Sequence, residues 1–226
     1  MKKIIFTLFT ISAAVMSCKK DTATPVADVV KYMSYNANST WNYEVINSLT
    51  ATTTNYTLTS TSRDSTVNNK AYHVFTNSSG SANEYYNLAG NDYYKFQNLP
   101  ANLSGNPIEN IYLKDNVAVN FSWSQPYNVT ASGVPLTITT VNTIVEKGIS
   151  KTVNNIAYTD VIHVTSTLSV SAFGIPLPAG AVTTDVQTYY AKKYGMIQSK
   201  NKININYSGI VSNTDEQTNL KSSDIK

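Results

Sequence analysis

The side chains that most often carry catalysis or bind metals are few in this chain. It has two histidines, one cysteine and 14 acidic residues among 226. His73 and His163 both lie in alternating, strand-like patterns, and Asp160, three positions before His163, is expected on the opposite face of that strand. Gly-rich phosphate loops and HExxH, GxSxG and CxxC motifs do not occur. We expect no catalytic residues, no metal site and no cofactor, although two distant carboxylates that meet in the fold, as in glycoside hydrolases, stay an alternative.

The only cysteine follows a segment that is typical of exported proteins. Lys2 and Lys3 precede an apolar run from Ile4 to Met16, and the small residue Ser17 stands directly before Cys18. This is the order of a signal peptide. The apolar run is too short for a membrane-spanning helix, which needs about 20 residues. We therefore prefer a signal peptide to a buried N-terminal helix followed by an incidental free cysteine.

The quartet Val15-Met16-Ser17-Cys18 resembles the lipobox of bacterial lipoproteins. The resemblance implies that residues 1–17 are a signal peptide, that cleavage falls between Ser17 and Cys18, and that Cys18 is acylated. Acyl chains gain about 0.8 kcal/mol per buried CH₂, so several of them hold a protein on a membrane. The following Lys19-Lys20-Asp21 is similar to Bacteroidota lipoproteins, which implies an outer-membrane location on either the surface or the periplasmic side.

The composition favours strands and gives little net charge. The chain contains 28 Thr, 26 Asn and 24 Ser, which are short polar residues that favour strands and turns over helices. Lys and Arg number 17, and loss of residues 1–17 removes Lys2 and Lys3 and leaves a nearly neutral protein. Nucleic acid needs clustered basic residues, and Arg63 is the only arginine. Nucleic acid is therefore excluded as an expected partner.

Alternation of apolar and polar residues predicts an all-β fold. Between Tyr158 and Ala172 most even positions are apolar and the odd positions are polar, as in an antiparallel strand with one buried face. Long strands with short links favour an up-and-down meander that curls into a half-barrel or open barrel, rather than a Greek-key sandwich. About ten strands are expected, at 40–48, 52–63, 70–78, 83–88, 91–97, 118–125, 134–147, 155–172, 182–193 and 196–208.

The rest of the chain is assigned around this sheet. Residues 18–38 are expected to be a lipidated tether, and the segment 26–34 is either a short helix or an extended linker. A single β domain is expected over 39–209, and residues 210–226 are expected to form a C-terminal tail. The protein is expected to be a monomer.

A heptapeptide occurs twice. Thr66-Val67-Asn68-Asn69-Lys70-Ala71-Tyr72 is repeated, with one difference, at 152–158. Two readings are open: Val-Asn-Asn is a common hairpin tip, or the domain is duplicated, with repeats at 40–97 and 118–207. Duplication is favoured because Trp41 and Trp123 precede the two copies and a Tyr-Tyr pair follows each.

A family resemblance rests on the motifs Trp41-x-Tyr43, the second-half Trp123, and Tyr189-Tyr190-Ala191-x-x-Tyr194-Gly195-Met196-Ile197. Together they resemble uncharacterised Bacteroidota outer-membrane lipoproteins with a LolA-like curved sheet. The resemblance spans about residues 39–207. It implies a curved sheet and carries no agreed activity.

Binding is the function class that this sequence favours. A curved sheet with an apolar concave face suits an apolar or lipid ligand, or an envelope partner. Two apolar hairpin segments are expected either to form a lip that touches ligand or membrane, or to pack on each other: Val134, Pro135 and Leu136, with Phe173, Ile175, Pro176 and Leu177. The alternatives are a surface glycan-binding protein that uses Tyr85, Tyr93 and Tyr189 for ring stacking, and a purely structural envelope module.

Overall fold

The fold is known from a computed structural model, which describes residues 30–97, 103–131, 133–207 and 210–226. The predicted signal peptide, its cleavage site at Ser17 and Cys18, and residues 18–29 of the predicted tether lie outside the described residues. No helix long and apolar enough to cross a membrane occurs in the part of the chain that is described.

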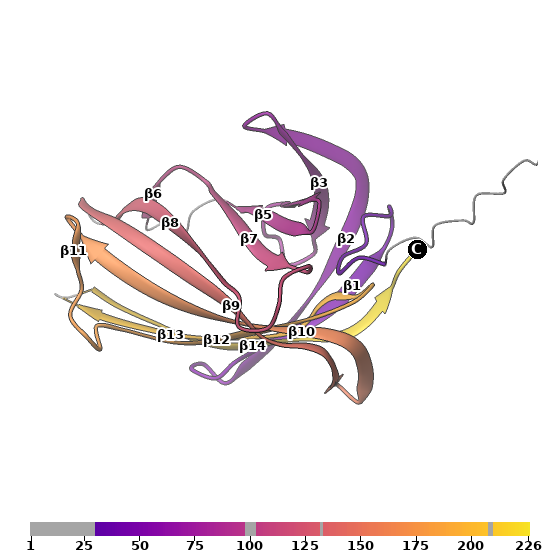
Figure 1. Ribbon diagram of the computed structural model, residues 1–226. Helices are drawn as coiled ribbons and strands as arrows, with labels where there is room; N and C mark the ends of the chain where they lie inside the picture. Colours follow the sequence, from indigo (N-terminus) through magenta and orange to yellow (C-terminus); the bar gives the residue numbers. More distant parts are fainter. Residues whose placement is uncertain (1–29, 98–102, 132, 208–209) are drawn as a thin grey trace, which may run out of the picture.

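The described chain forms 14 strands and no α-helix, and all strands belong to one open, curved antiparallel sheet (Figure 1). The all-β curved architecture predicted from the sequence is confirmed. The strands are β1 Thr40–Asn47, β2 Thr52–Val67, β3 Lys70–Asn77, β4 Glu84–Ala89, β5 Asp92–Gln97, β6 Leu103–Gly105, β7 Ile108–Lys114, β8 Ser122–Ala131, β9 Val134–Val153, β10 Ile156–Ala172, β11 Ile175–Pro176, β12 Val182–Ala191, β13 Gly195–Tyr207 and β14 Ile210–Asp224.

The first and last strands lie in the middle of the sheet. The strand order is β6-β8-β9-β10-β12-β13-β14-β1-β2-β3-β4-β5-β7, and the short β11 pairs with β10. From β1 the chain runs outward to β5, visits the opposite edge with the short β6, and returns to form the edge strand β7 beside β5. It then continues at the opposite edge with β8 and returns strand by strand to β14. The first and last strands therefore pair with each other, from Thr40 opposite Asp224 to Asn47 opposite Glu216.

Several predicted boundaries were wrong. The segment 210–226, expected to be a tail, contains β14, which is paired with β1 on one side and β13 on the other. Residues Ser212–Asn219 of this strand are polar on both faces, so β14 lacks most of the alternation by which the other strands were predicted. The structure has 14 strands rather than about ten, because β6, β7, β11 and β14 were missed, and the strand predicted at 118–125 is Ser122–Ala131.

The two edges of the sheet face each other, and side chains join them where no backbone ladder does. Trp123 Nε1 on β8 donates a hydrogen bond to the carbonyl of Ile111 on β7 at 2.8 Å. The amide of Ile111 donates to Oε1 of Gln125 at 2.7 Å, and Nε2 of Gln125 donates to the carbonyl of Glu109 at 3.4 Å. These bonds satisfy polar groups at the edge of β7, so the sheet is rolled and its seam is closed by side chains.

The repeated heptapeptide forms the same turn twice. Asn68 and Asn69 have φ values of 50° and 61°, and Asn154 and Asn155 have values of 48° and 65°. Two successive residues with positive φ are typical of a type I′ hairpin, which asparagine tolerates well. Both copies are therefore two-residue hairpin tips, β2–β3 and β9–β10, and the duplication itself stays a prediction.

One end of the rolled sheet is tightly packed. We call it the packed end, and it contains residues 30–39, the β9–β10 turn, the β12–β13 turn and the C-terminus. Large side chains from eight strands are fully buried in the core that extends from this end: Trp41, Phe75, Tyr93, Leu113, Ile144, Ile162, Ile197 and Leu220. The opposite end, which we call the open end, is formed by the ends of strands at Ala131 and Val134, Ala172 and Ile175, and Tyr207 and Ile210; these lie together at the left of Figure 1.

The segment before β1 is part of the fold. Tyr32 and Met33 are buried, and the backbone amide of Lys193 donates a hydrogen bond to the carbonyl of Lys31 at 2.7 Å. Gly195 makes this approach possible, because a Cβ there would lie 2.9 Å from Sδ of Met33. Within the described part of the predicted 26–34 segment there is no helix, and residues 30–38 are not a free tether, because they close the packed end.

Candidate functional site

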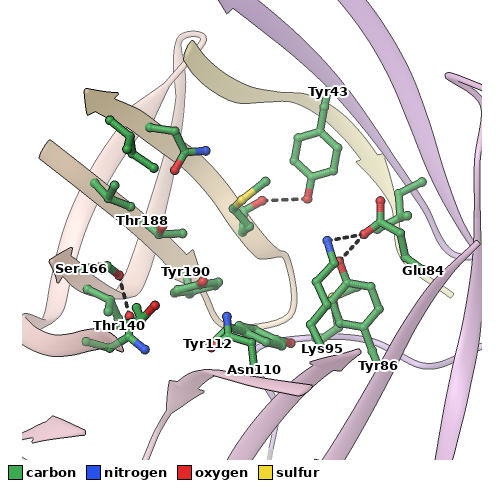
Figure 2. A pocket seen from close by; sticks show the side chains of 18 of the residues that line it. Tyr43, Glu84, Tyr86, Lys95, Asn110, Tyr112, Thr140, Ser166, Thr188 and Tyr190 are labelled. Carbon is green, nitrogen blue, oxygen red and sulfur yellow. Dashed lines mark hydrogen bonds and ion pairs between the residues drawn. The ribbon is translucent and has the colours of Figure 1, made fainter. Parts of the chain in front are cut away.

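A cavity of about 450 Å³ lies inside the rolled sheet, between the packed core and the open end (Figure 2). Its walls come from alternate residues of the strands, such as Val164, Ser166 and Leu168 on β10, because every second side chain faces the inside. The lining residues are Met33, Tyr43, Tyr56, Leu58, Glu84, Tyr86, Lys95, Asn110, Tyr112, Thr140, Asn142, Val164, Ser166, Leu168, Val186, Thr188, Tyr190, Met196, Asn201 and Ile203.

Aromatic rings form one wall of the cavity. Tyr86 and Tyr112 are edge to face with centroids 5.9 Å apart, and Tyr112 lies 5.5 Å from Tyr190. Tyr43 stacks on Tyr56 at 5.1 Å. Burial raises the pKa of the Tyr43, Tyr86 and Tyr112 phenols well above their ordinary value, so all three stay neutral. The wall therefore offers flat apolar faces with hydroxyl groups at their edges.

A single ion pair stands in this wall. Lys95 Nζ lies 2.7 Å from Oε2 of Glu84, which also accepts a hydrogen bond from the Tyr86 hydroxyl at 2.6 Å. Asn77 donates to the other carboxylate oxygen at 2.8 Å. Burial alone would raise the pKa of Glu84, but Lys95 and the hydrogen bonds outweigh it and lower the pKa. Glu84 is thus an anion held by several partners, of which Figure 2 shows Lys95 and Tyr86.

The remaining polar groups of the cavity are uncharged. Ser166 Oγ donates to Oδ1 of Asn142 at 2.6 Å, and the Tyr43 hydroxyl donates to the carbonyl of Met196 at 2.9 Å. Thr140 and Thr188 lie beside them (Figure 2). The lining thus mixes aliphatic, aromatic, hydroxyl and amide groups, which suits an amphipathic molecule better than a purely apolar chain.

Outside the cavity, Ser60, His73 and Asp64 are connected as in a catalytic triad. Ser60 Oγ lies 2.9 Å from Nε2 of His73, and Nδ1 of His73 lies 2.9 Å from Oδ1 of Asp64. Ser60, however, is 0% exposed. A nucleophile must be reached by its substrate, so this chain of hydrogen bonds holds the bulge between Ser60 and Asp64 rather than activating Ser60.

His163 on β10 also has a carboxylate opposite it, that of Glu146 on the neighbouring strand β9. Nδ1 of His163 lies 2.8 Å from Oε2 of Glu146, and its ring stacks on Tyr189 at 4.0 Å. Lys151 Nζ lies 3.8 Å from the centre of the same Tyr189 ring. Both faces of Tyr189 are therefore occupied, and it is not free to stack on a sugar.

The pairing of each histidine with a carboxylate was not predicted from the sequence, although the position of the two-residue turns indicates it. Counting outward from a two-residue turn at Asn68-Asn69 places Asp64 opposite His73, and counting from Asn154-Asn155 places Glu146 opposite His163. The register of a hairpin follows from its loop length. Recognition of the turn type therefore would have given both pairs.

The predicted glycan platform does not form. Tyr93 is 0% exposed, and its hydroxyl donates to Oδ2 of Asp115 at 2.7 Å, so its assignment as a contact residue was wrong. Tyr85 is half-buried and lies against Phe96 at 6.4 Å. Tyr85, Tyr93 and Tyr189 thus lie in different surroundings and make no exposed row.

The predicted lip residues gather at the open end. Phe173 and Ile175 are each 71% exposed. The amide of Phe173 donates to the carbonyl of Pro135 at 3.2 Å, so the two predicted segments are neighbours. Val134, Leu136 and Leu177 are half-buried and Pro176 is exposed.

No three His, Cys, Asp or Glu side chains among residues 30–97, 103–131, 133–207 and 210–226 are placed to hold a metal ion. Ser17 and Cys18 lie outside these ranges.

Comparisons with known proteins give a fold. No family model matches the sequence, and no curated protein matches it. The structure is similar to the crystal structure of a candidate lipoprotein from Parabacteroides distasonis, with a TM-score of 0.52 and 10% identity. It is also similar to a candidate exported protein with a YmcC-like fold from Bacteroides fragilis, with a TM-score of 0.50 and 7% identity. Both matches cover 87% of this chain and 100% of the other chain, so the whole rolled sheet is a fold shared with proteins from the Bacteroidota.

Proposed function

We propose that this protein is a lipid-anchored binding protein of the bacterial cell envelope that holds a small amphipathic ligand inside its rolled sheet. The observation that carries the proposal is the 450 Å³ cavity with its mixed lining. Its volume falls within the range of small-molecule sites, roughly 300–1,000 Å³. The lining offers apolar contact from Leu168, Val186 and Ile203 and hydrogen bonds from Thr188 and Asn201.

The envelope location is supported by two independent observations. The sequence from Lys2 to Cys18 has the order of a lipoprotein signal peptide, and the fold occurs in a candidate lipoprotein and a candidate exported protein. We assign the anchor to Cys18 at the outer membrane. The resemblance to LolA-like carriers supports a hollow sheet as the place of binding.

We favour binding over catalysis because the one triad-like cluster has a buried serine. Ser60 is 0% exposed and no substrate carbonyl reaches it. The cavity itself holds a carboxylate, Glu84, that is already neutralised by Lys95 and held by Tyr86 and Asn77.

Anchoring is tested by replacing the acylated residue. Cells that produce the Cys18→Ala variant are expected to lose palmitate labelling of the protein and its sedimentation with the outer-membrane fraction. A Cys18→Ala protein that stays in the membrane, together with a parent protein that takes up no palmitate, would contradict the anchor.

Ligand binding is tested by filling the cavity. Leu168→Trp places an indole inside the cavity, whereas Ser169→Trp places the same indole on the outer face one position further along β10. A dansyl-labelled undecanoic acid is expected to bind the parent and Ser169→Trp proteins with a rise in emission, and to bind Leu168→Trp about tenfold more weakly or not at all. Equal binding to all three would place the ligand elsewhere.

A further inference from the structure

The strands from β8 to β14 carry few charged side chains towards the open end. On the long strands from β8 to β14, the stretches 116–145, 161–184 and 203–214 contain no Asp, Glu, Lys or Arg. The last charges before the open end are Asp185, Lys202 and Asp215, which lie side by side on β12, β13 and β14. His163, the one histidine in these stretches, is buried towards the packed end.

This charge-free zone is deep. From Lys202 to Tyr207 the strand rises about 17 Å, at roughly 3.3 Å per residue. Most polar residues in it are Thr, Ser and Asn, which carry no charge. The zone therefore exceeds the roughly 5–10 Å to which interfacial protein segments enter the headgroup and acyl boundary.

Large apolar side chains project from the rim of this zone. Phe173 and Ile175 are 71% exposed and Val211 is 65% exposed. Phe173 and Ile175 belong to the β10–β11 tip, and Val211 lies near the start of β14, at the same end in Figure 1. The three side chains thus come from two parts of the sheet. Pro135 and Leu136 lie beside Phe173 and line a shallow groove of about 400 Å³ with it.

We propose that the open end docks on the surface of a lipid bilayer, with Phe173 and Ile175 of the β10–β11 tip and Val211 of β14 inserted among the lipids. A bilayer fits all three features: apolar tips gain free energy on insertion, uncharged polar residues tolerate the headgroup region, and charged residues lie farther back. A second copy of the chain fits less well. A stable protein interface buries about 800 Å² on each partner, whereas three side chains on two protrusions offer much less.

Docking of this kind is hydrophobic rather than electrostatic. The nearest charges to the tips are paired, Lys202 with Asp215 at 2.9 Å and Lys200 with Asp185 at 2.5 Å. Binding is therefore expected to be independent of anionic lipid and of salt, unlike that of a basic surface. The inference is independent of the proposed ligand, because it rests on the outer rim and not on the cavity.

The test uses tryptophan as a local probe in the full chain, with Cys18→Ser so that no acyl chain is added. Phe173→Trp reports on the open end, and Ile156→Trp is the matched control, since Ile156 is 40% exposed at the packed end. The native Trp41 and Trp123 are buried and give a constant background. Each variant is titrated with phosphatidylcholine vesicles that contain brominated acyl chains, with and without phosphatidylglycerol.

The expected result is a blue shift and strong quenching for Phe173→Trp, unchanged by phosphatidylglycerol or by salt, and little change for Ile156→Trp. Adding Ile175→Asp to Phe173→Trp is expected to raise the lipid concentration at half-quenching about tenfold. Equal quenching at both ends, or none at position 173, would overturn the proposal. A blue-shifted Phe173→Trp emission without vesicles, together with a dimeric mass in sedimentation, would overturn it in favour of a second copy.

Discussion

Along β10, the inner side chains nearest the packed end are Ile162 and Val164, which are buried, and those beyond them are Ser166 and Leu168, which are half-buried. Strand β12 shows the same change in the reverse direction, from Thr188 and Val186 to the buried Tyr190. The strands, their pairing and their alternation do not change between the two ends. A single sheet therefore encloses a packed core at one end, where Tyr32 and Met33 also fill the interior, and a cavity farther along.

The largest expected effect tests whether the packed end carries the stability. Phe75 is 0% exposed, and its ring contacts Trp41, Tyr35 and Tyr86. Phe75→Ala is expected to lower the free energy of unfolding by about 3–5 kcal/mol, because it leaves a cavity in a close-packed region. Leu168 lines the cavity and serves for comparison. Leu168→Ala is expected to lower the free energy of unfolding by about 1 kcal/mol, since this side chain is already half exposed. Equal losses in urea denaturation would mean that both ends are packed alike.

The next test concerns the ion pair between Lys95 and Glu84 in the cavity wall. Lys95→Met leaves the Glu84 carboxylate without its cation in a mostly buried place, at an expected cost of about 2 kcal/mol. The double variant Glu84→Gln with Lys95→Met removes both charges and is expected to recover most of this loss in thermal unfolding. A double variant as unstable as the single one would show that Lys95 acts through packing rather than through charge.

The closure of the packed end is tested at Gly195. Gly195 has a φ of 70°, and a Cβ there would lie 2.9 Å from Sδ of Met33 and 3.3 Å from the carbonyl oxygen of Tyr32. Gly195→Ala is expected to cost about 1–2 kcal/mol more than backbone strain alone. Gly180→Ala is the matched control, because Gly180 has a φ of 85° with no atom within 4 Å of the new Cβ. Similar losses for both variants in urea denaturation would rule out the contact with residues 30–39 as the cause.

The smallest expected effect is a pH dependence. The folded-state pKa of Glu84 is lowered, so its charged form stabilises the fold at pH values above about 4.3, the value for an unfolded chain. This contribution is lost as the pH falls through the folded-state pKa. The Glu84→Gln variant is expected to lose less stability than the parent between pH 5 and the folded pKa in thermal unfolding. Parallel curves for the two proteins would show that other carboxylates cause the acid sensitivity.

The strands with alternating apolar and polar residues could be predicted from the sequence, whereas a strand without this alternation could not. The alternation of Ile162, Val164 and Leu168 against His163, Thr165 and Thr167 gave the correct inward face of β10. The strand β14 has no such alternation, and it exists because β1 and β13 both need a partner. Pairing between residues so far apart in the sequence leaves no local pattern to detect.

The candidate site shows the same limit. The apolar tips with Phe173 and Ile175 were recognised, since a run of apolar residues around Gly174 and Pro176 is visible locally. The cavity was not predicted, because whether a curled sheet is hollow depends on how far the inward side chains of one wall extend towards the opposite wall. Tyr93 illustrates the difficulty: in a Tyr-Tyr pair one ring must face inward, and the alternation does not say which pair member faces the core.

The pairing of β1 with β14 has a consequence for how the protein is made. Thr40–Asn47 pairs with β2 on one side and with residues 216–224 on the other, so the pairing with the greatest sequence separation lies in the middle of the sheet. Proteins dominated by such distant pairings fold slowly, because the loop entropy is lost before the contacts form. Synthesis of the last strand must therefore be complete before the first strand is held on both sides. One side of β1 therefore has no partner until the last strand of the sheet has been synthesised.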